Sequence, residues 1–290
     1  MDPRFKSVPK EVAEIVDTGI FWINYTHLTT DFSRQGIEKT GKILSAGTAM
    51  GDGIIPFTGE FLLVSHLGKR YVVSVSDYPP QSHSWRDYIS TFQAWTPEGS
   101  DAWIAKMKEY RGNVLERKIN LGDFLNPNLK QNVAHLIDEC IESEEHRKKT
   151  YGAMNDEERG RLKNQRPEIY AFDSKLSKLV RKNLPRYGVK SDHPIAPSEI
   201  KLERYLTGMF TEGDVAETAR WVSNLVGRSI PVASIDALAT WETIFPQLPI
   251  AQKFERPGFF YRALMDDLSV RSAAISETKA YCEKTISPVK

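Results

Sequence analysis

Apolar residues recur every three to four positions along most of the chain, which is the spacing of helices that bury one face. Between residues 8 and 26, for example, Val12, Val16, Ile20 and Ile23 follow this period. The pattern predicts helices over 8–26, 31–46, 197–210, 214–226, 234–243 and 257–285, the last with a break near Ser269. Capping residues and prolines predict further helices that begin at Ser82 or Ser84, Ser100, Asn126, Asn155 and Pro167, the last ending before Pro185.

One segment carries a strand pattern instead. Residues 60–65 and 71–76 are rich in Val, Leu, Phe and Tyr, and they flank a short connection that contains Gly68. This arrangement predicts a β-hairpin over about 60–76. Because a lone hairpin is marginally stable in water, we expect it to pack on helices or to join another strand.

The chain therefore belongs to the mainly α class, and we expect two helical lobes with the hairpin in the N-terminal one. Its 290 residues are 40% hydrophobic and 27% charged, which is typical of globular proteins. We place the lobes at 1–150 and 151–290. The boundary can instead lie at 185–197, where Gly188, Pro194 and Pro197 interrupt the helical pattern.

Two observations bear on location. Cys140 and Cys282 stand far apart with no metal-binding or redox spacing, so we expect two buried thiols in a reducing compartment. The N-terminus has no apolar stretch of the kind found in signal peptides, and the most apolar early run is too short to span a membrane. These features predict a cytoplasmic protein that does not enter a membrane.

No motif for catalysis or metal binding stands out, so we expect no cofactor and no metal. The six histidines show no zinc spacing, although His135 with Glu139 and Glu142 with His146 share a helix face. The glycine-rich segment 47–53 lacks the strand and the lysine of a phosphate loop.

The charge is unevenly distributed. The whole chain has a formal net charge of +1, but residues 146–190 hold 13 basic and five acidic side chains, a net of +8, which leaves −7 for the remainder. A basic segment between two lobes favours contact with a polyanion.

A predicted helix over 172–184 would arrange part of this charge as a stripe, because its leucines share one face and its lysines the other. The aromatic residues Trp85 and Trp95 are weaker candidates for stacking on bases. The predicted phosphate contacts are Arg147, Lys148, Lys149, Arg159, Arg161, Lys175, Lys178, Arg181, Lys182 and Arg186.

In its helical, bilobed organisation with a basic middle, the chain is similar to the nucleoproteins of segmented negative-strand RNA viruses; this similarity concerns organisation and rests on no motif. The sequence thus predicts a non-enzymatic, self-assembling protein that binds single-stranded nucleic acid through its phosphates, as a nucleoprotein or capsid protein does. One alternative is a small-molecule enzyme with an aromatic pocket near Asp266, Asp267 or His193. Another is a protein-binding effector that uses the exposed apolar segment 259–261.

Overall fold

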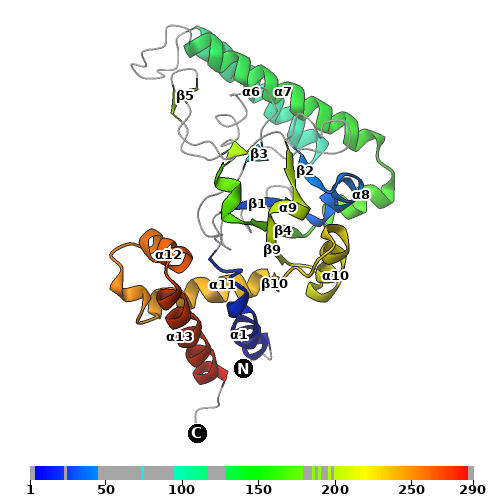
Figure 1. Cartoon of the computed structure of the whole chain (residues 1–290). Coiled ribbons are helices and arrows are strands. Elements are labelled where there is room, and N and C mark those ends of the chain that lie inside the picture. Colours follow the sequence, from blue (N-terminus) through cyan, green and yellow to red (C-terminus); the bar gives the residue numbers. More distant parts are fainter. Residues whose placement is uncertain are drawn as a thin grey trace.

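The computed structural model describes residues 4–22, 25–44, 73–74, 95–116, 129–178, 185–186, 189–190, 195–196 and 199–286. The described chain is mainly α, with short strands between the helices. Figure 1 shows three layers: a pair of long helices at one end, a small sheet in the middle and a group of helices at the other end, where both termini lie. The predicted class, mainly α with some β, is confirmed.

Helices account for most of the described residues. The α-helices are α1 (Arg4–Ile15), α2 (Arg34–Thr40), α6 (Pro97–Leu115), α7 (Leu129–Ala153), α8 (Asp156–Lys163), α9 (Leu202–Tyr205), α10 (Val215–Val226), α11 (Ile235–Ile244), α12 (Pro257–Asp266) and α13 (Leu268–Ile286). Short 3-10 segments are η1 (Val16–Thr18), η2 (Asp31–Ser33), η3 (Ser174–Lys178), η4 (Phe245–Gln247) and η5 (Ala251–Lys253).

The central sheet has four strands in the order β1-β4-β9-β10. These are β1 (Tyr25–Thr30), β4 (Pro167–Phe172), β9 (Leu206–Thr211) and β10 (Val232–Ser234). β4 runs antiparallel to both of its neighbours, whereas β9 and β10 are parallel and are joined by the crossover helix α10. Two-residue or three-residue strands make the remaining pairs: β2 (Lys42–Leu44) with β8 (Glu199–Lys201), β3 (Val73–Ser74) with β7 (Ile195–Ala196), and β5 (Pro185–Arg186) with β6 (Val189–Lys190).

Both faces of the central sheet are buried, and successive strand residues point to opposite sides. Ile169 and Phe210 face the core that contains α1, α11, α12 and α13, where Phe21 stacks on Trp241 with ring centroids 5.1 Å apart. The neighbouring residue Tyr170 faces a second core, which also takes in residues of α2, α9 and α10. The sheet is therefore the shared wall of two apolar cores.

The pair α6 and α7 forms a separate layer beyond the sheet (Figure 1). Its small core contains Ile104, Val114, Ile137 and Ile141. Thr96 caps α6 by accepting a hydrogen bond from the backbone of Gly99, so the predicted start at Ser100 is one turn too late.

The later helices follow the prediction closely. α10 and α11 match 214–226 and 234–243, and α12 and α13 match 257–285 with a break beside Ser269. The predicted start of α8 at Asn155 is also confirmed: Asn155 and Glu158 form a capping box in which each accepts from the other's backbone N–H at 2.9 Å. In α10 and α12 one face stays in solvent, so their period is visible in the sequence.

Four predicted helices are wrong in part or in full. The one over 8–26 is α1, which begins earlier, at Arg4, and ends at Ile15. The 3-10 segment η1 follows it and is closed by Gly19 in a left-handed conformation, and Tyr25 begins a strand. Residues 31–46 form η2, the short α2 and then β2, with Gly41 in the left-handed region at the helix end. The segment that begins at Pro167 starts with the strand β4 in place of a helix. The segment predicted as a helix over 197–210 contains β8, the short helix α9 and most of β9.

Two further predictions concern residues outside the described ranges. Most of the predicted hairpin lies outside the described ranges. Its described residues, Val73–Ser74 (β3), pair with β7. Residues 82–94, with which the helix predicted from Ser82 or Ser84 begins, also lie outside these ranges.

The central sheet crosses the predicted lobe boundary at residue 150. β1 precedes this position and β4, β9 and β10 follow it, and α1 packs on α13 and α11. Residue 150 itself lies inside α7. The first and last parts of the chain thus build one common layer.

Candidate nucleic-acid interface

The predicted basic stripe does not form as a helix. Phe172 is the last residue of β4, and the chain continues into η3, where Leu176 is buried while Lys175 and Lys178 are exposed. Arg181 and Lys182 lie outside the described residues, and Arg186 is described only as part of β5. The arrangement of charge expected over 172–184 is therefore corrected: its described part is a strand end and a short 3-10 segment.

Several of the other predicted phosphate contacts already have partners within the protein. Lys148 forms an ion pair with Asp101 of α6. Lys175 lies 3.6 Å from the Asp173 carboxylate, which lowers the charge that it presents to a ligand. Arg159 donates to the backbone oxygens of Tyr151 and Gly152 at 3.4 and 3.3 Å, and its exposure is only partial. These contacts leave fewer basic side chains available to bind a phosphate.

Arg147 and Trp95, for which the sequence predicts phosphate contact and base stacking, contact each other instead. The Arg147 guanidinium lies 4.5 Å from the centre of the Trp95 ring, and its residue is only 6% exposed. Trp95 donates its indole N–H to Glu144 at 2.6 Å and packs edge-on against Tyr151. The structure gives these two residues a role in holding α7 to the start of α6. Trp85 lies outside the described residues.

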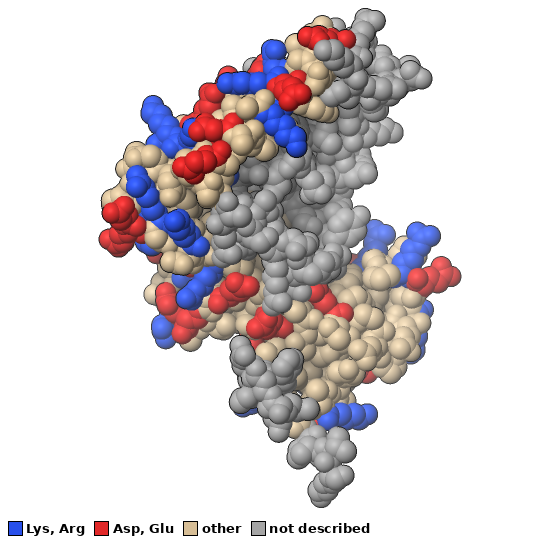
Figure 2. Space-filling model, turned by 180° about the vertical axis from the view of Figure 1, so that it is seen from behind, with Lys and Arg blue, Asp and Glu red and all other residues tan. Residues whose placement is uncertain are grey.

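Basic and acidic side chains are mixed over the surface. Figure 2 shows the blue and red groups interspersed along the exposed edge of the molecule, with no large uniformly blue area among the described residues on that face. A binding site for a polyanion must accordingly be local. It requires cations that are exposed, close together and not already neutralised by acids.

One depression meets this description. It has a volume of about 370 Å³ and is lined by Asp31, Phe32, Gly160, Arg161, Asn164 and Arg166. Arg161 and Arg166 are both exposed, and among the described residues neither has an ion-pair partner. The Arg161 guanidinium lies 5.9 Å from the centre of the Phe32 ring. We refer to this depression as the arginine pocket.

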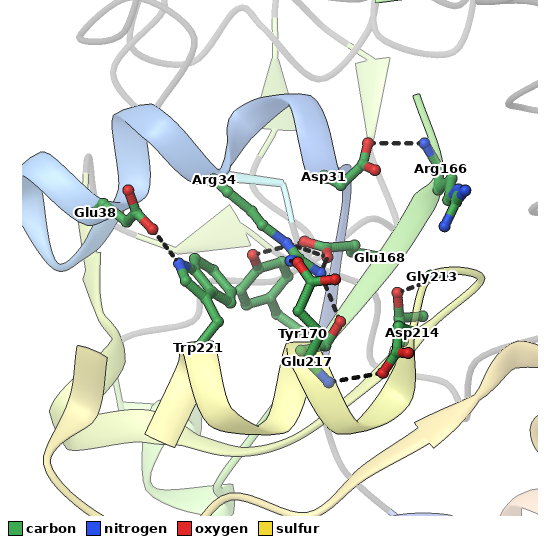
Figure 3. A network of polar contacts seen from close by, with 12 residues as sticks. Asp31, Arg34, Glu38, Arg166, Glu168, Tyr170, Gly213, Asp214, Glu217 and Trp221 are labelled. Carbon is green, nitrogen blue, oxygen red and sulfur yellow. Dashed lines mark hydrogen bonds and ion pairs between the residues drawn. The ribbon is translucent and has the colours of Figure 1, made fainter. Parts of the chain in front are cut away.

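Local structure fixes the shape of the arginine pocket. The capped helix α8 contributes Arg161 in its last turn, and Asn164 is its C-cap. Two hydrogen bonds join the opposite wall to the start of β4: Asp31 N–H donates to the carbonyl of Arg166 at 2.9 Å, and Arg166 N–H donates to Asp31 Oδ1 at 2.8 Å. Figure 3 shows Asp31 and Arg166 side by side at this junction. These hydrogen bonds hold residue 31 against residue 166.

A buried ion pair lies directly behind this wall. Glu168 is fully buried on β4, and Arg34 of α2 donates to its Oε1 from Nε at 2.7 Å and from Nη2 at 2.5 Å (Figure 3). Tyr170 donates its hydroxyl to the second oxygen, Oε2, at 3.0 Å. Arg34 also donates to Thr218 of α10 at 2.6 Å. This network ties α2, β4 and α10 together.

Burial and pairing act in opposite directions on this network. Burial raises the pKa of Glu168, and the hydrogen bonds from Arg34 and Tyr170 oppose that shift. Burial also raises the pKa of Tyr170 well above its ordinary value, so its hydroxyl stays a hydrogen-bond donor. The network thus has a structural role: it holds α2, β4 and α10 together next to the arginine pocket.

The sequence predicts Arg161 in the interface but misses Asp31, Phe32, Asn164 and Arg166. Arg166 belongs to the basic segment, yet a helical interpretation of the residues after it gives it no place in the predicted stripe. One signal is present: the residue before a proline avoids the helical conformation, and Arg166 precedes Pro167. No local sequence pattern indicates that residues 31 and 32 lie next to residue 166.

The other candidate sites are not assembled among the described residues. Asp267 caps the N-terminus of α13 by accepting from the backbone and the hydroxyl of Ser269, so it is occupied by a structural role. Phe260 is buried, whereas Phe259 is 52% exposed. In the part of the chain that is described, no three His, Cys, Asp or Glu side chains come together as a possible metal site, and no helix has the length and apolarity to cross a membrane. His193 and residues 47–53 lie outside that part.

Both cysteines are buried, as the sequence predicts, and neither forms a disulfide within the described residues. Comparison of the chain with protein-family models, with curated proteins and with solved structures found no match.

Proposed function

We propose that this protein binds single-stranded nucleic acid through its phosphate backbone, and that the arginine pocket is a principal contact. The observation that carries the proposal is that Arg161 and Arg166, two exposed residues without ion-pair partners among the described residues, line one depression beside an aromatic ring. Guanidinium groups bind phosphate oxygens in a planar, bidentate fashion. A neighbouring ring adds a surface on which a base can stack.

Further cations extend the site along the chain. Lys163 is exposed at the end of α8 and Lys149 near the end of α7, and no ion pair within the described residues neutralises either one. A flexible single strand can follow such separated charges, whereas a rigid duplex needs a matching groove. We include Lys149 and Lys163 as secondary phosphate contacts, and we propose that the role is binding and self-assembly rather than catalysis.

The test is a titration of a fluorescently labelled single-stranded oligonucleotide, followed by anisotropy at several salt concentrations. On a single strand, each phosphate that a cation neutralises adds about 0.7 to the slope of log affinity against log salt. The double variant R161A/R166A should therefore bind at least about ten-fold more weakly, with a slope shallower by about 1.4.

A matched control removes the same charge elsewhere. Arg256 and Arg262 are exposed on or beside α12, in the layer that holds the termini, and R256A/R262A should leave affinity and slope close to those of the unchanged protein. Circular dichroism of both variants checks that the fold is retained. Equal binding by the two double variants, or binding without any salt dependence, would contradict the proposal. Light scattering of the purified protein tests self-assembly separately.

A further inference from the structure

A carboxylate shares the arginine pocket with the two cations. Asp31 lines the same depression as Arg161 and Arg166, yet among the described residues it forms no ion pair with either. Its position is fixed, because its backbone N–H and its Oδ1 are both hydrogen-bonded to the backbone of Arg166, at 2.9 and 2.8 Å. A ligand that enters the pocket must therefore lie near this carboxylate.

For a ligand that consists of phosphate alone, this neighbour is unfavourable. Two negative charges several ångströms apart repel each other, more strongly where water is partly excluded. The repulsion is offset when the ligand also carries a hydrogen-bond donor, because a bond to an ionised acceptor is stronger than one between neutral groups. The second oxygen of Asp31, Oδ2, has no hydrogen-bond partner among the described residues and is open to such a donor.

We propose that Asp31 is a specificity-determining residue, which makes the arginine pocket select nucleotides over bare polyanions by accepting a hydrogen bond from a donor that the ligand carries near its phosphate. Nucleotides supply this donor in two ways, as a ribose hydroxyl or as an N–H group of the base. Asn164, in the same pocket, offers an amide that can pair with either group. This inference rests on the proposed function, since it concerns the same pocket.

The substitution Asp31→Asn separates selectivity from structure. Asparagine has the same shape, and its Oδ1 can still accept the hydrogen bond from Arg166 N–H, but the open oxygen becomes an NH2 donor and the charge is removed. Asp31→Ala, by contrast, also removes the bond to Arg166. Thermal unfolding of both variants shows whether the pocket wall is retained: D31N should unfold close to the unchanged protein, and D31A earlier.

The measurement compares three probes by competition against labelled oligo(U) of about 12 nucleotides, a length within the usual single-strand site sizes. The probes are unlabelled oligo(U), its 2′-O-methyl form and inorganic polyphosphate of matched charge. We expect the unchanged protein to prefer oligo(U) over polyphosphate by about ten-fold, which is the size of one hydrogen bond to a charged group. D31N should lose that preference and bind polyphosphate more tightly.

The outcomes distinguish the two proposals. If the 2′-O-methyl form competes like polyphosphate, the ribose hydroxyl is the donor; if it competes like oligo(U), the base is. A D31N variant that strengthens all three probes equally shows that Asp31 acts only through its charge, and this overturns the inference while the proposed function stands. Binding that R161A/R166A leaves unchanged would instead overturn the proposed function.

Discussion

The buried pair of Arg34 and Glu168 offers the sharpest test of how the central layer is held together. Arg34→Ala removes two hydrogen bonds to Glu168, one to Thr218 and the contact of the guanidinium with the Trp221 ring, whose centre lies 4.8 Å away. Glu168 is left fully buried with Tyr170 as its remaining hydrogen-bond donor in the network.

The expected cost follows from the burial. Removing one partner of a buried ion pair costs about 3–5 kcal/mol, because the other charge stays desolvated. That is a large part of the roughly 5–15 kcal/mol by which domains are stable. The assay is urea denaturation followed by circular dichroism, and the change in free energy of unfolding is taken from the midpoint. The exposed residue Arg220 on α10 gives a control, since R220A should change stability by no more than about 0.5 kcal/mol.

A second substitution tests the cause. In R34A/E168Q the side chain of residue 168 is neutral, so most of the loss should be recovered. The sign of the pH dependence provides a further check. Burial raises the pKa of Glu168 even in the unchanged protein, and removal of Arg34 takes away the main opposing contact. A raised pKa favours the folded state at low pH and disfavours it as pH rises, so the difference between R34A and the unchanged protein should shrink from pH 7 towards pH 5. A loss as small as that of R220A, or one that E168Q does not relieve, would refute the reasoning.

Three further outcomes are expected. Gly208→Ala in β9 should destabilise the protein by about 1–3 kcal/mol in urea denaturation, because the added carbon would lie 2.8 Å from Ile20 Cγ1; Gly112→Ala, with open space in α6, should instead stabilise it by about 0.5–1 kcal/mol. Glu11→Ala should lower the midpoint, since Glu11 of α1 accepts from both the N–H and the hydroxyl of Ser234 at 2.6 and 2.7 Å; Glu14→Ala, an exposed neighbour on the same helix, should not. Asp267 has a pKa lowered by its hydrogen bonds to Ser269 and Val270, so its capping of α13 is present at neutral pH and is lost as pH falls through that lowered pKa; urea midpoints of D267A and the unchanged protein should converge in acid, and a constant gap would contradict this.

The sequence predicts those elements that keep one face in water. α10 and α12 show the helical period clearly because their apolar residues gather mainly on one face. β4 does not show a strand period, because all six of its residues are buried, Glu168 included, and a short apolar run of this kind resembles a buried helix. β4 forms a strand because it pairs with β1 and β9, and no local sequence pattern reveals these pairings.

The arginine pocket is also partly predictable, because some of its residues lie in features that the local sequence reveals. Arg161 lies on a capped helix within a basic segment, and both features are visible in the sequence. Asp31 and Phe32 reach the pocket only because β1 pairs with β4, far along the chain. Conversely, the net charge of a segment does not show that Arg147 is buried or that Lys148 is paired. Segment charge identifies the region, and only the tertiary contacts identify which cations are available.

The pairing of β1 with β4 also bears on how the protein is made. Thr30 lies opposite Pro167 in that ladder, so β1 leaves the ribosome long before its partner exists. At a synthesis rate of about 5–20 residues per second, the strand waits roughly 7–30 s, and β9 and β10 follow later still. During this interval its unpaired edge and the apolar side of α1 are exposed. We expect nascent chains to depend on chaperones, and ribosome-bound chains that end before residue 167 should remain sensitive to protease within β1.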